Sequence, residues 1–360
     1  MRHSLRTPAS LLSTPPHIRF PPPWRQTLFP AHRPGAVHWP DAVGPDLTPA
    51  MTLNGFPDND PRTSARGVRT GQALAAPVED MPPPTDSRNV AMLVAYEGHS
   101  FQGWQLQPNG PTVQGALEDA LRVLYGRRVV VNGSGRTDTG VHAFNQVAHV
   151  RLPRSPGQSR NTDLPPADLP PADLRKVRAS LNGLAGPHIA VKALVDVPDH
   201  FHARHRALGK HYRYQLFNHA YSPVFGRHRA WWLKLPLDAA AMRQAANHMV
   251  GHHDFSAFRA RDCAAKSPQR SLTRLDIQEV DTPEGNLWID LEANGFLQHM
   301  ARIIVGTLVA VGQGKLAQEE MAAILASGER SRASATAPGA GLHLMSVKYD
   351  LEAYPQLKNF

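Results

Sequence analysis

The uneven distribution of proline divides this sequence into two parts. Residues 1–88 hold 17 of the 33 prolines, including Pro21-Pro22-Pro23 and Pro82-Pro83-Pro84. Apolar residues there follow neither the helix period nor the strand period. Proline lacks a backbone N–H, and a segment so poor in apolar pattern cannot bury enough surface to offset its chain entropy. We therefore expect residues 1–88 to be a disordered tail and the folded part to follow it.

The tail matches no targeting signal. Its first forty residues carry five arginines and no acidic residue, as transit peptides do, but prolines interrupt any amphipathic helix. Leu11-Leu12 is too short for the apolar segment of a secretory signal. The tail is then either dispensable or the product of a start codon assigned too far upstream, with Met51 or Met81 as the alternative start.

Charge and cysteine content narrow the class of protein. The chain has 39 basic against 30 acidic residues, a formal charge of +9, and residues 89–360 alone carry +7. A basic surplus favours a polyanionic partner, nucleic acid first. The single cysteine, Cys263, excludes a disulfide framework and a cysteine-cluster metal site. No run of eighteen apolar residues is present, so we expect a reducing, aqueous compartment, the cytoplasm.

Residues 89–360 alternate between strand and helix patterns, which predicts an α+β fold. The predicted strands are 89–96, 129–131, 146–152, 189–197, 212–217, 272–280, 287–293 and 344–349. The predicted helices are 113–125, 174–184, 238–250, 296–311 and 317–326. We divide this part into an N-terminal half, 89–200, and a C-terminal half, 201–360, with mixed or antiparallel sheets around a central cleft. The proline-rich stretch 153–173 is interpreted as an inserted linker.

One glycine-rich loop between two predicted strands carries the candidate chemistry. It runs Gly133-Ser134-Gly135-Arg136-Thr137-Asp138-Thr139-Gly140 and lacks the Gly-Lys-Ser/Thr of a phosphate loop. In an extended chain, Arg136 and Asp138 point to the same side. A neighbouring guanidinium favours the ionised carboxylate, which suits a nucleophile or an anionic stabiliser and not a general acid. Taken alone, the pattern also fits a surface turn with an ion pair.

The stretch Gly135 to Ala143 resembles the signature of the tRNA pseudouridine synthase A (TruA) family. Further stretches similar to the family follow in family order: Tyr96-Glu97-Gly98, Phe101 to Gln105, Asp199 to Arg204, Lys210 to Tyr214, Asp254 to Arg259 and Asn294 to Gly306. The resemblance covers residues 91–350 and leaves out the tail and the insert. It implies the pseudouridine synthase fold.

The resemblance implies an isomerase that needs no cofactor and no metal. Its expected substrates are uridines at positions 38, 39 and 40 of the tRNA anticodon stem-loop. The N1–C1′ bond is cleaved, the uracil turns, and it rejoins through C5. Asp138 matches the family's catalytic aspartate, acting near C1′ of a flipped uridine either as nucleophile or as base toward the 2′ position. Removing the base from its stack costs about a few kcal/mol.

Four other residues receive roles from the same resemblance. Arg136 matches the arginine that occupies the vacated space and holds the RNA backbone. Tyr212 matches the tyrosine that lies against the uracil and handles its C5 proton. Arg302 is expected to pair with Asp138, since an unpaired charge on an apolar helix is costly to bury. Leu297 is expected either in the wall of the uracil pocket or in the core.

Basic residues beside the predicted tyrosine and on a later loop are expected to contact tRNA phosphates, although a solvated charged face is the ordinary alternative. They are Arg204, Arg206, Lys210 and Arg213 in the first group, and Arg259 in the second. The sequence His252-His253-Asp254 lacks the spacing of a metal site, so no metal is expected.

Family members are homodimers, so a homodimer is expected by resemblance. The alternatives are a non-catalytic RNA-binding protein of the same fold, a hydrolase that releases the base, and a pseudouridine synthase acting on another RNA. Glycoside hydrolases usually require two carboxylates, and the loop offers only Asp138. A protein that only binds RNA needs no carboxylate beside the phosphates. The presence of Asp138 therefore favours an enzyme over the non-catalytic RNA-binding protein.

Overall fold

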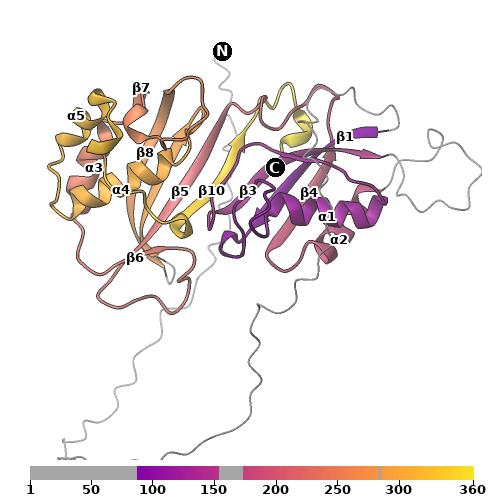
Figure 1. Ribbon diagram of the computed structural model, residues 1–360, viewed down its shortest axis with the longest axis horizontal. Coiled ribbons are helices and arrows are strands. Elements are labelled where there is room, and N and C mark those ends of the chain that lie inside the picture. The colour runs from indigo at the N-terminus through magenta and orange to yellow at the C-terminus, as the bar shows by residue number, and fades with distance from the viewer. Residues whose placement is uncertain (1–86, 154–172, 283–284) are drawn as a thin grey trace, which may run out of the picture. The chain divides into compact units, whose positions relative to one another are not determined.

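The computed structural model describes residues 87–153, 173–282 and 285–360 (Figure 1). The predicted disordered tail, 1–88, lies outside this range except for Ser87 and Arg88, where the prediction is wrong because both belong to a strand. The predicted linker, 153–173, likewise lies outside the described residues except at its ends, where Pro153 closes a strand and Asp173 caps a helix. The three described segments form the fold and contain the candidate site.

Within the described residues, ten strands form one mixed sheet. The strands are β1 (Ser87–Tyr96), β2 (Val131–Gly133), β3 (His142–Pro153), β4 (Ile189–Asp196), β5 (Gly209–Asn218), β6 (Trp231–Leu233), β7 (Gly251–Asp254), β8 (Gln269–Thr282), β9 (Gly285–Ala293) and β10 (Leu342–Lys348). Their order is β4-β1-β3-β10-β5-β9-β8-β7, with β2 paired to β3 and β6 paired to β5. The predicted mixed α/β class is confirmed.

Five helices accompany the sheet in the described segments: α1 (Val113–Tyr125), α2 (Leu174–Leu184), α3 (Ala239–Asn247), α4 (Met300–Gly312) and α5 (Glu320–Ser327). Helices α1 and α2 lie beside the part of the sheet that contains β1, β3 and β4, and α3, α4 and α5 lie beside the part that contains β8 (Figure 1). None of these helices is long and apolar enough to cross a membrane.

Helix α1 shows how local signals set an element. The Thr112 hydroxyl accepts a hydrogen bond from the Gly115 N–H, which caps the first turn. The helix ends at Gly126, whose φ of 66° is the left-handed conformation that glycine adopts at helix ends. Leu117 and Leu121 are fully buried. The predicted range, 113–125, is confirmed.

Helix α4 begins later than predicted. The apolar run from Phe296 predicts a helix over 296–311, but the helix starts at Met300, after His299 in the left-handed conformation with φ 63°. Phe296 packs its ring against Tyr212, and Leu297 is 4% exposed. Phe296 and Leu297 are apolar because they pack against the protein as part of a loop. The spacing of apolar residues alone does not distinguish such a loop from the first turn of a helix.

Strand β10 joins the two predicted halves. It pairs in parallel with β3, where Leu344 lies opposite Ala143. On its other side it pairs antiparallel with β5, where Leu344 lies opposite Tyr212. The sheets predicted for the two halves are therefore continuous, and residues from both halves meet at this strand (Figure 1).

Candidate active site

The glycine-rich loop connects β2 to β3 and is held by backbone contacts. The Thr137 carbonyl accepts a hydrogen bond from the Trp104 N–H at 3.0 Å. Gly103, with φ +89°, lies so close that a Cβ there would be 2.5 Å from the Thr137 oxygen. Only glycine permits this conformation together with this approach. The loop that carries Asp138 therefore rests on the segment that follows β1.

Asp138 forms an ion pair with Arg302 across the two halves. The Arg302 guanidinium donates to Asp138 Oδ2 at 2.8 Å and, through Nε, to the Ala337 carbonyl at 2.7 Å. His299 Nε2 lies 3.5 Å from the same carboxylate oxygen. The expected pairing of Arg302 with Asp138 is present, and it is a charge-assisted hydrogen bond of ordinary length.

The second carboxylate oxygen of Asp138, Oδ1, has different surroundings from Oδ2. Among the described residues, none contacts Oδ1 by a hydrogen bond or an ion pair. The Asp138 side chain is 28% exposed, whereas that of Arg302 is 16% exposed. One oxygen is thus oriented by the protein, and the other is available to a substrate atom.

Tyr212 reaches this region through the sheet. It lies opposite Leu344 of β10, which in turn lies opposite Ala143 of β3, at the end of the loop. Tyr212 and Ala143 are therefore two strand spacings apart, which is about 10 Å. Burial raises the pKa of the Tyr212 phenol, and the nearby Tyr96 and Asp138 raise it further. The phenol stays neutral at physiological pH and retains its proton as a hydrogen-bond donor.

Aromatic and apolar groups surround the loop and the tyrosine. The Tyr96 hydroxyl shares a hydrogen bond of 2.8 Å with the Thr137 hydroxyl, beside Asp138. The Phe296 ring meets the Tyr212 ring edge to face, with 5.0 Å between the centroids. Leu297 is buried in the main core. Its predicted place in a uracil pocket stays a prediction.

Lys210 lies against the loop. Its ammonium donates to the Ser134 carbonyl at 3.0 Å, and a Cβ on Gly135 would come within 2.0 Å of Nζ. Burial lowers the pKa of Lys210 to about 8, and the charge of Arg204 adds to this effect. Lys210 thus supports the loop from inside the protein, a role that the sequence did not predict. Its contact with phosphate stays a prediction.

The remaining predicted cations differ in their surroundings. Arg136 is exposed and donates to the Gln105 side chain at 3.0 Å. Arg204 and Arg206 are exposed, and Arg259 is half-buried. These four stay candidates for RNA contact.

Arg213 is engaged within the protein. It donates two hydrogen bonds, of 2.9 and 3.0 Å, to the fully buried carboxylate of Asp290. His211 is also bonded to this carboxylate, at 2.7 Å. A structural ion network therefore accounts for part of the predicted basic segment.

Two residues near Asp138 were missed by the sequence interpretation. His299 was assigned to a helix interior, whereas its left-handed backbone brings its ring to the carboxylate. Among the described non-glycine residues it alone has a positive φ, and such strain concentrates at functional sites. Tyr96 belongs to a family-like stretch, but nothing local indicated its bond to Thr137.

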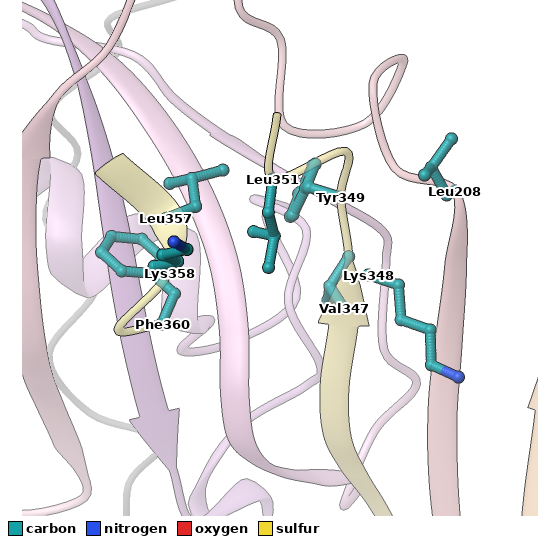
Figure 2. A pocket seen from close by; sticks show the side chains of 8 residues that line it. All are labelled: Leu208, Val347, Lys348, Tyr349, Leu351, Leu357, Lys358 and Phe360. Carbon is teal, nitrogen blue, oxygen red and sulfur yellow. The ribbon is translucent and has the colours of Figure 1, made fainter. Parts of the chain in front are cut away.

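A shallow apolar pocket lies elsewhere, at the end of β10 (Figure 2). Its lining consists of Leu208, Val347, Lys348, Tyr349, Leu351, Leu357, Lys358 and Phe360. None of the residues predicted for the site belongs to this lining. The candidate active site is the region of Asp138, Arg302 and Tyr212, where the ion pair lies near the buried tyrosine.

The chain is similar to known proteins that share one name. The family model that matches residues 245–350 is described as tRNA pseudouridine synthase. A protein of Paramagnetospirillum magneticum named "tRNA pseudouridine synthase A" is 43% identical over 259 residues, 72% of this chain and 94% of that protein. Proteins of the same name from Geotalea daltonii and a Geobacter species are 40% and 42% identical, each over 73% of this chain and over 100% and 99% of their own lengths.

The mixed sheet, the paired aspartate and these matches together define the class, that of the pseudouridine synthases. Within it, the chain belongs to the tRNA pseudouridine synthase A family.

Proposed function

We propose that this chain is an isomerase that converts uridine to pseudouridine in tRNA. Membership of the family and the names of its relatives support the reaction. The observation that carries the proposal is the Asp138 carboxylate, whose Oδ2 is held by Arg302 and whose Oδ1 has no partner among the described residues. An ionised, oriented and accessible carboxylate is what attack near C1′ requires.

Asp138 acts at the ribose of a flipped uridine, as nucleophile at C1′ or as base toward the 2′ position. Arg302 orients the carboxylate and balances its charge in both cases. The neutral phenol of Tyr212 lies against the uracil and moves the C5 proton. Leu297 and Phe296 supply apolar surface beside the base, which favours a stacked, water-poor site.

The substrate positions are uridines 38, 39 and 40 of the anticodon stem-loop. Arg136 occupies the space that the flipped base leaves, because a guanidinium both stacks on bases and binds phosphate by two donors. The backbone on either side is held by further cations; they are Arg204, Arg206, Lys210 and Arg259. The protein acts in the cytoplasm, as a homodimer in which one tRNA touches both subunits.

The two halves, 89–200 and 201–360, contribute different parts of the site. Asp138 and Arg136 come from the first, and Tyr212 and Arg302 from the second. The ion pair between Asp138 and Arg302 forms only when both halves are folded, so the site is complete only then. This arrangement supports a single catalytic centre per chain.

The test uses the purified full chain, an unmodified tRNA transcript with uridines at 38–40, and position-specific detection of pseudouridine. We expect product at these positions with wild type, and none with Asp138→Asn, whose RNA affinity stays within a few-fold. A product elsewhere in RNA would favour a synthase with another substrate. Free uracil would favour the hydrolase. Wild-type binding without any product would favour the non-catalytic RNA-binding protein, and turnover by Asp138→Asn would refute the role of the carboxylate.

A further inference from the structure

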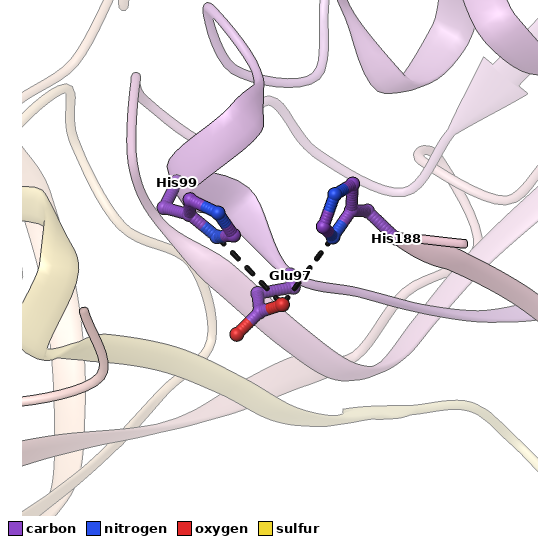
Figure 3. A group of neighbouring side chains, drawn as sticks. All are labelled: Glu97, His99 and His188. Atoms are coloured by element: carbon purple, nitrogen blue, oxygen red, sulfur yellow. Dashed lines mark hydrogen bonds and ion pairs between the residues drawn. The ribbon is translucent and has the colours of Figure 1, made fainter. Parts of the chain in front are cut away.

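A second polar cluster lies where the segment after β1 meets the segment before β4. Glu97 follows β1, His99 lies in the short 3-10 helix Gly98–Ser100, and His188 precedes β4. The Glu97 N–H donates to the His188 carbonyl at 3.0 Å, which brings the two segments together. Figure 3 shows both imidazoles directed at one carboxylate oxygen.

The spacing of these three groups also suits a shared cation, in which case the hydrogen bond between His188 Nδ1 and Glu97 Oε2 gives way to metal ligation. His188 Nδ1 lies 3.3 Å and His99 Nδ1 3.7 Å from Glu97 Oε2. A charge-assisted N–H to carboxylate bond is about 2.7–2.9 Å. Two ligand atoms that share a tetrahedral Zn²⁺ at ordinary bond lengths lie about 3.3 Å apart. One ligand atom from each residue lies within 4.8 Å of the others, so all three can face one ion.

Neighbouring groups hold the cluster in this orientation. Arg229 Nε donates to the other oxygen of Glu97, Oε1, at 3.1 Å. The second ring nitrogen of His99 is 3.1 Å from the Ser100 hydroxyl. Outer contacts of this kind orient the ligands of metal sites.

We propose that Glu97, His99 and His188 form a binding site for a divalent transition metal, with Zn²⁺ as its principal occupant. Two imidazole nitrogens and one carboxylate oxygen suit Zn²⁺, whereas Mg²⁺ and Ca²⁺ prefer sets of oxygens only. The side chains are 29%, 32% and 38% exposed, so an ion reaches them from solvent and a water molecule completes its coordination. Arg229 opposes binding by its charge but leaves Oε2 to the ion.

The bound ion would fasten the segment after β1 to the segment before β4. The intervening Gly98 packs on the catalytic loop, since its N–H donates to His142 Nδ1 at 3.1 Å. A Cβ on Gly98 would lie 2.0 Å from the Val141 carbonyl. The site is thus a structural fastening beside the loop that carries Asp138 and takes no part in the reaction. The proposal is independent of the proposed function.

The test measures Zn²⁺ binding to the full chain, prepared without a histidine tag and stripped with a chelator. The double variant His99→Ala/His188→Ala removes two ligands. Because the chain has 19 histidines, the double variant His252→Ala/His253→Ala, on another exposed segment, is the matched control. Zn²⁺ affinity is measured by competition with a chromophoric chelator, and the thermal midpoint is recorded with and without Zn²⁺.

We expect the double variant at 99 and 188 to lose Zn²⁺ affinity by at least about tenfold and to lose the rise in thermal midpoint that Zn²⁺ gives wild type. The control is expected to retain both. If the double variant does not fold, His99→Gln, which removes one ligand, is measured in its place against the same criterion. A smaller loss, a loss equal to that of the control, or the absence of binding by wild type would overturn the proposal.

Discussion

The Arg302 guanidinium holds Oδ2 of Asp138 at 2.8 Å, although 164 residues separate the two in the sequence. The arginine is itself fixed by its bond to the Ala337 carbonyl. It is the third residue of α4, so the direction of that helix sets the direction of the carboxylate. The orientation of the Asp138 carboxylate is thereby set by the packing of α4.

Arg302→Lys should keep the positive charge and lose the bridge between Asp138 and Ala337. Because misplacement of a reacting group by about 1 Å costs about 10²-fold in rate, we expect kcat to fall by about that factor. The affinity for tRNA should change little. Single-turnover assays and RNA-binding titrations measure the two quantities.

The matched control for this variant is Arg243→Lys, an exposed arginine paired with Glu279. It should leave kcat unchanged. A wild-type kcat in Arg302→Lys would show that orientation by the guanidinium is unimportant.

Tyr212→Phe should remove the phenol hydroxyl and keep the stacking ring. If the hydroxyl moves the C5 proton, kcat falls by about 10²-fold, within the range of general acid–base catalysis, and KM stays within a few-fold. The control is Tyr125→Phe, whose buried hydroxyl has no partner among the described residues. Equal kcat values for the two variants would remove the hydroxyl of Tyr212 from the mechanism.

Gly103→Ala should destabilise the protein. At φ +89°, the new Cβ is both in an unfavourable backbone region and 2.5 Å from the Thr137 carbonyl. We expect a loss of about 2 kcal/mol or more in the free energy of unfolding, with a loss of activity because the loop of Asp138 shifts. Urea denaturation measures the first effect.

Gly186→Ala separates the two causes, because Gly186 has φ +84° and nothing within 4 Å of a new Cβ. It should show the backbone cost alone and keep its activity. If both variants are equally stable, the close approach to Thr137 contributes nothing.

Asp290 should make the free energy of unfolding depend on pH in the acidic range. Burial acts to raise its pKa, but the hydrogen bonds from His211 and Arg213 outweigh this and lower it from 3.8 to about 2. A carboxyl with a depressed pKa in the folded state stabilises above its unfolded pKa and loses this contribution as pH falls toward the folded value. The contribution is about 2 kcal/mol at pH 7.

Asp290→Asn should therefore unfold with a free energy lower by at least about 2 kcal/mol at pH 7, and the difference should shrink below about pH 4. Urea denaturation at a series of pH values measures it. Asp276→Asn, an exposed acid opposite Asp290 on the neighbouring strand, is the control. A difference that is constant between pH 7 and pH 3 would contradict the assignment.

The sequence predicted the elements whose signals are local. Helix α1 has its cap, its apolar stripe and its terminal glycine within fifteen residues. The strands β8 and β9 were recognised from their alternating pattern and the short connection between them. The short strands β6 and β7 were missed, since three or four residues carry no readable period.

Contacts between segments that are far apart in the sequence were harder to predict. The family resemblance supplied Asp138, Tyr212 and the pairing with Arg302. Neither periodicity nor spacing indicated that β10 would lie between β3 and β5, or that Lys210 would support the loop at Ser134. The cluster of Glu97 and His99 with His188 depends on the pairing of β1 with β4, and the ninety residues between them conceal it in the sequence.

The place of β10 has a consequence for how the protein matures. A ribosome makes Asp138 and Tyr212 long before Leu342, and until β10 emerges the stretches of β3 and β5 that pair with it lack that partner. Exposed strand edges favour aggregation. Chains that stop early would therefore be prone to associate, and the final stretch of synthesis is what closes the sheet and joins the strand of Tyr212 to the strand that follows the Asp138 loop.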